Sequence, residues 1–430
     1  MIQSGVALRL PPHSKMEIDL KTAHHDLWHW CRAHDFAGYD PYDALNSKLF
    51  QSTPFHNSRV ARLVWTQLFK RSPLNLRRLA RVPEERNPKG TALFALAALA
   101  DYRRLRTVEA EVDARALLDD MIGAQLTGKS GAACWGYNFD WQSRSFFAPR
   151  GTPTVVPTAF AARALAEASL LFEDEAYLQA ARSACGFILN DLNRSEESAD
   201  EVCFSYSSLD RTRVFNASLL AGEVLASVGA VTGEKDLVDQ AMRAVRYVVR
   251  RQSDDGSWAY GVDGYQSWAD NFHTAFVLTS VSRTIQSCRS SDWQVTEELS
   301  AETRRAQRLR REDVEAMGNA LQRGYNFWRE RFFLANGWPK YFPDRLYPAD
   351  AHSAGAALVA LAELQSLDHR ATELAETIAR WAIENLRDPR GFFHYQRRRF
   401  HTVRVPYMRW SEGWMMYGLA RILECQNRER

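Results

Sequence analysis

Two kinds of helical segment alternate along this chain, and this alternation limits the fold more than any other feature of the sequence. Segments rich in small and apolar residues recur, and amphipathic segments with charged residues lie between them. Both kinds show the 3.6-residue periodicity of helices, while strand-like alternation is weak throughout. The apolar segments begin, roughly 57 to 79 residues apart, at Lys89, Val155, Val214, Asn271, Asp350 and Tyr407. The amphipathic segments span 114–125, 176–192, 235–252, 313–333 and 371–386.

A repeat of helix pairs builds either an open solenoid or a closed toroid. A helix that is apolar around most of its circumference has to be covered on most sides. The apolar segments therefore fit an inner ring and the amphipathic segments an outer ring. We predict an all-α fold, an (α/α)6 toroid (barrel) of alternating inner and outer helices, as a single domain over residues 1–430. An N-terminal extension (1–35) and a polar insertion (289–312) are expected to lie outside the repeat.

The junction after one amphipathic segment has a more specific pattern. The stretch RAVRYVVRRQSDDGSW, residues 243–258, resembles the repeat motif of triterpene cyclases, which ends in Q-x3-G-x-W. Gln252 is expected to end the outer helix, Gly256 to permit a tight turn and Trp258 to pack back. The acidic motifs DxDD and DDxxD of terpenoid enzymes are both missing from the sequence. The resemblance therefore implies a toroid, and terpenoid-cyclase chemistry is the least favoured function.

Charge, cysteine spacing and hydropathy exclude several other classes. The formal net charge of +3 is too small to indicate a nucleic-acid-binding protein. The six cysteines are scattered, with no CxxC and no Cys/His cluster, so neither a zinc site nor another cofactor is predicted. The first residues lack the pattern of a signal peptide, and no run approaches the ~18 apolar residues of a membrane span. We expect a cytoplasmic protein without a transmembrane segment.

Polar and aromatic residues precede or open each apolar segment. Asp or Asn in front of a helix is the preferred N-cap, which explains one such residue at each start. An N-cap does not explain two starts at which a carboxylate and an imidazole stand together on the first turn. These are Asp270 with His273 and Asp350 with His352. In a closed toroid these starts converge on one end of the cavity. A catalytic role is predicted for Asp140, Asp270, Asp350, His273, Glu412 and Tyr407.

The same loops contain the residue types that bind sugars. Flat aromatic rings stack on the C–H face of a pyranose, and short polar groups bond its hydroxyls. The basic loop from Arg397 to Arg404, together with Arg409, favours an anionic sugar such as a uronate, unless that loop is simply solvated. Predicted substrate-binding residues are Asp40, Asp43, Trp135, Tyr137, Asn138, Trp141, Asn216, Trp268, Asn271, His352, Arg409 and Trp410.

Several of these loops together resemble one bacterial family. The stretches YDPYDALNS, CWGYNFDWQ, DNFHTAFVL, DAHSAGAAL and PYMRWSEGWMMYGLA are similar to proteins associated with exopolysaccharide and capsule biosynthesis loci. Members often have the label δ-aminolevulinic acid dehydratase. That activity belongs to a TIM barrel with Schiff-base lysines, whereas this chain has an all-α pattern. The resemblance implies a polysaccharide context, with polysaccharide biosynthesis proteins as possible partners.

Three kinds of function remain open on these residues. A glycoside hydrolase-like enzyme acting on a uronate-containing oligo- or polysaccharide needs two carboxylates across the scissile bond. A polysaccharide lyase or uronyl C5-epimerase needs a base for the C5 proton and a group that neutralises the sugar carboxylate. A glycan-binding protein of a biosynthetic complex needs neither the pair of carboxylates nor the base. We expect an enzyme, with hydrolase chemistry first.

Overall fold

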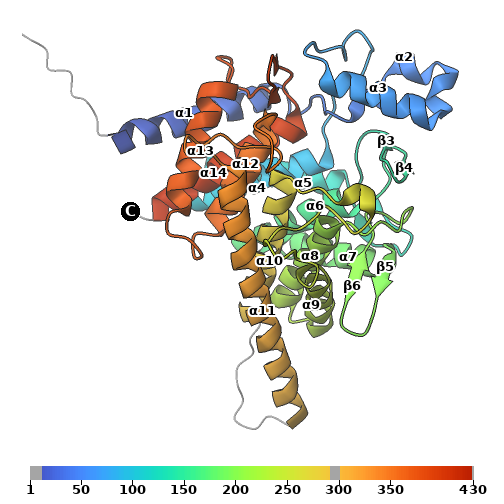
Figure 1. Cartoon of the computed structure of the whole chain (residues 1–430), viewed down its shortest axis with the longest axis vertical. Coiled ribbons are helices and arrows are strands. Elements are labelled where there is room, and N and C mark those ends of the chain that lie inside the picture. The colour runs from blue at the N-terminus through green and yellow to red at the C-terminus, as the bar shows by residue number, and fades with distance from the viewer. Residues whose placement is uncertain (1–11, 291–300, 429–430) are drawn as a thin grey trace, which may run out of the picture.

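The computed structural model describes residues 12–290 and 301–428, and most of them lie in helices (Figure 1). The inner helices contact one another in the order α4, α6, α8, α10, α12 and α14, and α14 returns to contact α4. This closed ring confirms the predicted (α/α)6 toroid. The inner helices are α4 (Pro88–Leu105), α6 (Val155–Phe172), α8 (Phe215–Thr232), α10 (Asn271–Ser290), α12 (Ala351–Glu363) and α14 (Gly413–Arg428).

The outer helices each pack on an inner partner. α5, α7, α9, α11 and α13 contact α4, α6, α8, α10 and α12 in turn, and α1 contacts both α13 and α14. The helix α1 therefore takes the sixth outer position and belongs to the double ring, although the sequence placed it in an N-terminal extension. The outer helices are α1 (Pro12–Ala33), α5 (Val108–Gly123), α7 (Glu175–Asn190), α9 (Lys235–Val249), α11 (Ala301–Phe332) and α13 (Ala371–Leu386).

The two segments expected outside the repeat are described only in part. Residues 1–11 of the N-terminal segment, and residues 291–300 of the polar insertion 289–312, lie outside the described residues. Residues 301–312 of that insertion belong to the beginning of the outer helix α11. Their charged residues are typical of a helix that lies on the outside of a fold.

Small residues let the inner helices approach closely. Gly355 of α12 is an example, because a Cβ added there would lie 2.5 Å from the backbone of Trp414 on the neighbouring α14. Among the described residues, α6 and α8 are long and apolar enough to cross a membrane by length and composition alone, yet 78% of each is buried inside the ring. Their apolar character therefore reflects contacts with neighbours on both sides.

The junction after α9 is built as its sequence predicts. The Gln252 side chain donates to the carbonyls of Gly256 (2.9 Å) and Ala320 (2.9 Å), which ties the end of α9 to α11. Gly256 has a φ of 87°, and a Cβ there would meet the carbonyl oxygen of Arg323 at 2.6 Å. Trp258 is buried, and its indole donates to the Val248 carbonyl. This residue pattern thus joins two outer helices to the turn that leads into α10.

The starts of the inner helices are linked by a repeated backbone contact. The first N–H of an inner helix, or of the turn before α14, donates to the carbonyl of a tyrosine in the adjacent loop. The pairs are Val155 with Tyr206, Phe215 with Tyr260, Asn271 with Tyr341, Ala351 with Tyr395 and Met408 with Tyr39, at 2.9–3.1 Å. One orphan N–H at each of these five starts is thereby satisfied, and a tyrosine is fixed beside each of them.

Short strands and turns occupy the connections. The antiparallel pairs are β1 (Leu126–Thr127) with β2 (Ala133–Cys134), β3 (Trp141–Gln142) with β4 (Phe147–Ala148), and β5 (Arg194–Glu197) with β6 (Val202–Phe204). β7 (Ala349–Asp350), β8 (Gln396–Arg397) and β9 (Thr402–Val403) form a sheet in that order. The remaining short helices are η1 (Asp43–Asn46), α2 (Lys48–Gln51), η2 (Pro54–Asn57), η3 (Gly264–Gln266) and the π-turn η4 (Met408–Glu412).

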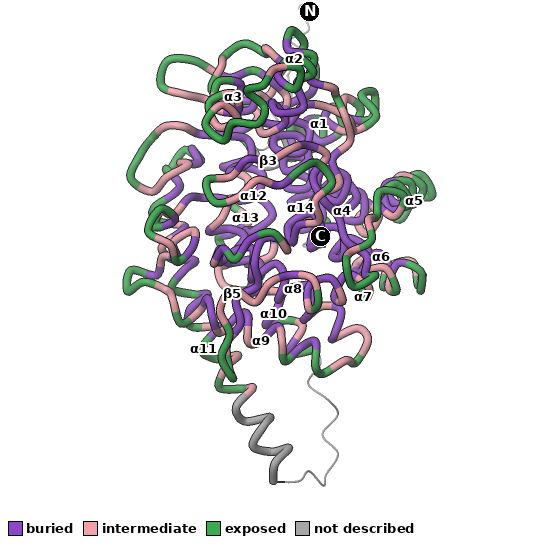
Figure 2. Tube along the Cα trace, turned by 90° about the vertical axis from the view of Figure 1, so that its right-hand side faces the viewer, coloured by how far each residue is buried: buried purple, intermediate pink, exposed green. Residues whose placement is uncertain are grey.

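One further helix, α3 (Arg59–Arg71), follows these short turns between α1 and α4. The α2–α3 segment projects from the ring in Figure 1. Figure 2 shows that its surface is largely exposed, whereas the inner helices are buried. The projecting segment therefore adds a separate surface to one end of the toroid.

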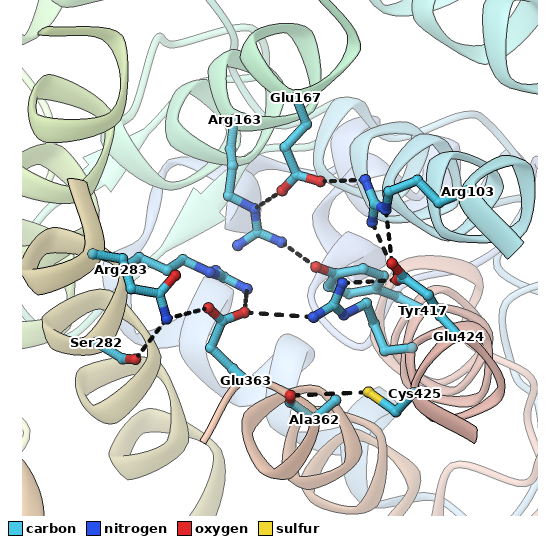
Figure 3. A network of polar contacts seen from close by, with 12 residues as sticks. Arg103, Arg163, Glu167, Ser282, Arg283, Ala362, Glu363, Tyr417, Glu424 and Cys425 are labelled. Atoms are coloured by element: carbon cyan, nitrogen blue, oxygen red, sulfur yellow. Dashed lines mark hydrogen bonds and ion pairs between the residues drawn. The ribbon is translucent and has the colours of Figure 1, made fainter. Parts of the chain in front are cut away.

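Buried ion pairs join the inner helices away from their starts. Arg283 of α10 bonds Glu223 of α8 (3.0 Å) and Glu363 of α12 (3.3 Å). Arg103 of α4 bonds Glu424 of α14 (2.9 Å) and Glu167 of α6 (3.2 Å) (Figure 3). All of the inner helices contribute to this network, which therefore fills the middle of the ring with polar contacts that only the closed fold can satisfy.

Candidate active site

A cavity of about 1010 Å³ lies at the end of the ring where the inner helices begin. Every inner-helix start adds a residue to its wall, because chain segments far apart in sequence meet there only when the ring closes. These residues are Lys89 for α4, Val156 for α6, Asn216 for α8, His273 for α10, His352 for α12 and Arg409 just before α14.

Aromatic rings form much of the wall. Tyr206, Tyr260 and Tyr341, three of the tyrosines fixed by the repeated backbone contact, line the cavity together with Tyr137. The hydroxyls of Tyr137 and Tyr206 lie 3.0 Å apart, and the Tyr260 ring stacks on Trp268 with centroids 4.5 Å apart. Such rings offer flat faces to a sugar and hydroxyls to its oxygens.

Asp270 and His273 form a hydrogen-bonded pair at the start of α10. Oδ1 of Asp270 accepts the backbone N–H of His273, and Oδ2 lies 2.9 Å from Nδ1 of the same residue. A carboxylate accepts, so Nδ1 bears the proton and Nε2 of the neutral ring keeps its lone pair. Asp270 is buried while His273 is partly exposed and lines the cavity. The pair has the arrangement of an oriented base.

His352 is a second imidazole in the same wall. It is buried, and both ring nitrogens are without a hydrogen-bond partner among the described residues. Burial and then the positive charges of Lys89 and Arg409 hold the pKa of His352 well below its ordinary value, so the ring is neutral at neutral pH. His273 and His352 both contact the ring of Phe272, with centroid distances of 4.1 and 4.2 Å.

The wall of the cavity is predominantly basic. Arg409 forms two hydrogen bonds with Asp40, at 2.6 and 2.8 Å, and Asp40 raises the pKa of Arg409 despite its burial. Burial lowers the pKa of Lys89, whose ammonium contacts the rings of Phe160, Phe276 and Trp414 instead of a carboxylate. The other charged lining residues are Lys70, Arg71, Arg144, Arg345 and Asp344. This balance suits an anionic ligand.

The structure divides the predicted site residues into two groups. One group lines the cavity: Tyr137, Trp141, Asn216, Trp268, His273, His352, Arg409 and Trp410. The other group lies outside its wall: Asp40, Asp43, Trp135, Asn138, Asp140, Asp270, Asn271, Asp350, Tyr407 and Glu412. The second group contains every carboxylate of the predicted set.

Most of the second group has a partner that explains it structurally. Asn271 donates to the Lys340 carbonyl and accepts from the Trp328 indole, which ties α10 to α11. Trp135 is fully buried and its indole donates to the Met121 carbonyl. Asn138 accepts from Asn46 and Asn87, the latter being the N-cap of α4. Asp140 accepts the backbone N–H of Arg150.

The remaining carboxylates are buried behind the wall. Oδ1 of Asp350 caps α12 at the N–H of Ser353, and burial raises the pKa of Asp350 to about 6. Oε2 of Glu412 accepts the N–H of Phe393, and burial raises the pKa of this carboxyl well above its ordinary value. Arg77 bonds both Asp43 (2.6 Å) and the Tyr407 hydroxyl (2.9 Å). These groups support the wall from behind.

The basic loop expected to bind an anionic sugar does not reach this cavity. Residues 397–404 are absent from its lining, and Arg397 bonds the side chain of Asn385 instead. The positive charge comes from Arg409, as expected, and from other parts of the chain, namely α3, the β3–β4 turn, the start of α4 and Arg345. Sequence reasoning missed Lys70, Lys89, Tyr206, Tyr260 and Tyr341 as site residues. The recurrence of a tyrosine ahead of several inner helices was the available signal.

Metal binding has no evident place here. Among the residues that the structure describes, no group of three or more His, Cys, Asp or Glu side chains is arranged to hold a metal ion. The described part of the cavity offers aromatic rings, imidazoles and cations instead.

Solved structures with similar folds include several sugar-processing proteins. A cellobiose 2-epimerase from Bacillus thermoamylovorans B4167 aligns with a TM-score of 0.58 at 11% identity, over 81% of this chain and 90% of that chain. A GH76 α-mannanase of Bacteroides thetaiotaomicron gives 0.56 at 14% identity, over 80% and 87%. An unsaturated glucuronyl hydrolase specific for heparin gives 0.54 at 11% identity, over 96% and 97%.

By sequence, no protein-family model and no curated protein matches the chain. The resemblance to the exopolysaccharide-locus family therefore stays a prediction. At 11–14% identity, the likeness to the solved structures shows the fold alone. The chain shares the helical toroid of these epimerases and glycoside hydrolases.

Proposed function

We propose that this protein is an enzyme that moves a proton on an anionic sugar, as a uronyl epimerase or a lyase does. The observation that supports this most directly is the pair of imidazoles, His273 and His352, which both contact the ring of Phe272. One imidazole is oriented by Asp270, and the other is held neutral by burial and nearby cations. Two imidazoles in one basic cavity suit proton transfer near neutral pH.

The chemistry follows from the groups in the wall. Nε2 of His273 takes the proton from the carbon next to the sugar carboxylate, and the C–H electron pair moves into that carboxylate as an enolate. Lys89 and Arg409 stabilise the added negative charge. In an epimerase, His352, which is neutral at rest, takes a proton from solvent as the enolate forms and gives it to the opposite face of the same carbon, while His273 releases its proton to solvent. In a lyase, the enolate expels the oxygen substituent at the neighbouring carbon as a double bond forms, and the protonated His273 gives its proton to the departing oxygen.

Hydrolysis by two carboxylates has less support. That mechanism needs a carboxylic acid and a carboxylate facing the glycosidic bond from opposite sides. Asp140, Asp350 and Glu412 do not line the cavity, and Asp270 is engaged with His273. In the described wall, Asp344 is the acidic residue, and it lies next to Arg345. Proton transfer by imidazole therefore ranks above the hydrolase chemistry that the sequence favoured.

The choice of a sugar rests on the wall and on the comparisons. The names of the similar structures refer to cellobiose, mannan and glucuronyl sugars, which supports a carbohydrate ligand for this cavity as well. The aromatic faces fit pyranose rings, and the cations fit a carboxylate. A cytoplasmic role in polysaccharide biosynthesis, with proteins of that pathway as partners, is part of the same proposal.

The test is incubation with uronate oligosaccharides in deuterated water. An epimerase is expected to place deuterium at the carbon next to the carboxylate, followed by NMR, and His273→Ala is expected to abolish this uptake. A lyase leaves no hydrogen on that carbon. Ultraviolet absorbance of an unsaturated product separates a lyase from an epimerase. New reducing ends without deuterium uptake or ultraviolet absorbance would mean hydrolysis and would overturn the proposal, as would unchanged turnover in both His273→Ala and His352→Ala.

A further inference from the structure

The projecting α2–α3 segment presents an unusual apolar surface. Val60, Val64 and Leu68 recur at intervals of four along α3 and are 69%, 62% and 51% exposed. Phe55, just before α3, is 64% exposed. Spacing of four residues places the three aliphatic side chains on one face of the helix. These exposed fractions mean that no described element covers this apolar stripe.

The charged residues of this part of the chain are all of one sign. The sequence from 44 to 83 contains no Asp and no Glu. In the same stretch, the exposed cations are Lys48, Arg59, Arg71, Arg78 and Arg81. An amphipathic helix with aliphatic and aromatic side chains on one face, and basic residues at its edges, is typical of a segment that lies in the plane of a membrane interface.

A second basic and apolar feature lies at the same end of the ring. The β8–β9 hairpin pairs with β7, which directly precedes α12, so the hairpin belongs to the cavity end. Phe400 at its tip is 86% exposed and follows Arg397, Arg398 and Arg399. The basic loop that does not reach the cavity thus offers an aromatic side chain among cations to the outside.

We propose that the α2–α3 segment docks this protein on an anionic lipid bilayer, with the β8–β9 hairpin as a second contact. The aliphatic stripe enters the interface between headgroups and acyl chains, and the flanking cations pair with lipid phosphates. The absence of acidic residues from 44 to 83 leaves cations as the charged side chains of this stretch, which favours an anionic bilayer as the occupant.

Docking in this way has a consequence for the cavity. The neighbouring face of α3 contributes Leu63, Gln67 and Lys70 to the cavity wall. A bilayer in contact with Val64 and Leu68 therefore lies beside the cavity mouth. A glycan attached to a lipid would reach the imidazoles without leaving the membrane surface.

The experiment is co-sedimentation of the full chain with vesicles of phosphatidylcholine alone and of phosphatidylcholine with phosphatidylglycerol. The wild type is expected to bind the anionic vesicles at least tenfold more strongly, and high salt is expected to weaken that binding. The double variant Val64→Glu/Leu68→Glu is expected to bind the anionic vesicles at least tenfold more weakly than the wild type does.

A matched control exists on α5. Val108 and Val112 are 72% and 58% exposed at the same spacing, but Glu109, Glu111 and Asp113 lie among them. Val108→Glu/Val112→Glu is expected to bind vesicles as the wild type does. The proposal is overturned if the wild type does not bind anionic vesicles, or if both double variants bind equally. It is also overturned if the α3 stripe instead mediates self-association, seen as a dimer that Val64→Glu/Leu68→Glu abolishes.

Deuterium uptake on a soluble uronate oligosaccharide separates this proposal from the proposed activity. Val64→Glu/Leu68→Glu alters no residue of the cavity wall, so its turnover of soluble substrate is expected to equal that of the wild type. Loss of vesicle binding with retained turnover supports docking by α3 independently of the chemistry.

Discussion

Asp270 bonds His273 twice, once at the backbone N–H and once at Nδ1 of the ring, each at 2.9 Å. One oxygen caps α10 and the other orients an imidazole. Asp350 caps α12 in the same way, but its second oxygen has no partner among the described residues. The difference follows from spacing. His273 is three residues after its cap Asp270, so its side chain lies on the same side of the helix as the cap. His352 is only two residues after Asp350, so its side chain lies on a different side.

Replacing Asp270 with Asn separates these two functions of its carboxylate. Asn is an equally good N-cap, so the free energy of unfolding is expected to change by less than ~1 kcal/mol. The amide does not stabilise an imidazolium, so kcat for deuterium exchange is expected to fall by roughly 10²–10⁴-fold. Steady-state kinetics and urea unfolding measure the two effects. Asp350→Asn is the matched control, and an equal loss of kcat there would contradict the role given to Asp270.

The buried carboxyl of Asp350 makes stability depend on pH. Burial raises its pKa from 3.8 to about 6, so the folded state prefers the protonated form. The stability that this carboxyl contributes is present below pH 3.8 and is lost as the pH rises through 6. Asp350→Asn keeps the cap and removes the titration. As the pH rises from 4 to 7.5, the free energy of unfolding of Asp350→Asn is expected to rise by about 2–3 kcal/mol relative to that of the wild type.

Urea unfolding at several pH values measures that gain. Asp140→Asn serves as the control, since this half-buried carboxylate lies outside the described cavity wall. A difference between Asp350→Asn and the wild type that is constant over this pH range would show that Asp350 does not titrate there.

The ion network in the middle of the ring is expected to be sensitive to the loss of one partner. Glu223 accepts from Arg283 (3.0 Å), Ser280 (2.6 Å) and Arg163 (3.4 Å), and it is buried. Glu223→Ala leaves buried cations without their acceptor and is expected to cost about 3–5 kcal/mol of stability. The helical pair Glu111 with Arg115 is one-third exposed, so Glu111→Ala should cost about 1 kcal/mol or less. Thermal unfolding compares the two, and equal costs would argue against a cooperative network.

Lys89 is expected to lower the stability of the fold and to raise the affinity for an anionic ligand. Burial and the charge of Arg409 lower its pKa, so the ring gains stability when the amine is replaced by an apolar side chain of similar length. Lys89→Met should therefore unfold at a higher temperature, and the difference should grow as the pH falls below 10.5, the ordinary value for lysine. Its affinity for a uronate should fall by about tenfold to hundredfold, because a charge-assisted hydrogen bond is lost.

Calorimetry with a uronate and with the matching neutral sugar distinguishes a charge effect from a general loss of the cavity. Only the affinity for the uronate should fall in Lys89→Met. Equal losses for both sugars would mean that Lys89 shapes the wall instead of binding a carboxylate.

The sequence alone determined the ring and the identity of its inner helices. Apolar character around a whole helix has one physical cause, contact on most sides, and this property is local to each segment. The motif at Gln252, Gly256 and Trp258 was readable because two of its hydrogen bonds, and the positive φ of Gly256, involve residues close in sequence. The outer position of α1 was not readable, because its inner partner α14 lies at the other end of the chain.

Only the tertiary structure decided which polar residues reach the cavity. A carboxylate at a helix start looks the same in sequence whether it faces the cavity or lies behind the wall, as Asp350 and Glu412 do. Lys89 gave no local signal, because its position in the cavity wall depends on residues of distant inner helices, such as Phe276 and Trp414. Closure of the ring brings six starts together, and the side-chain directions at that closure separate the residues that can touch a ligand from those that support them.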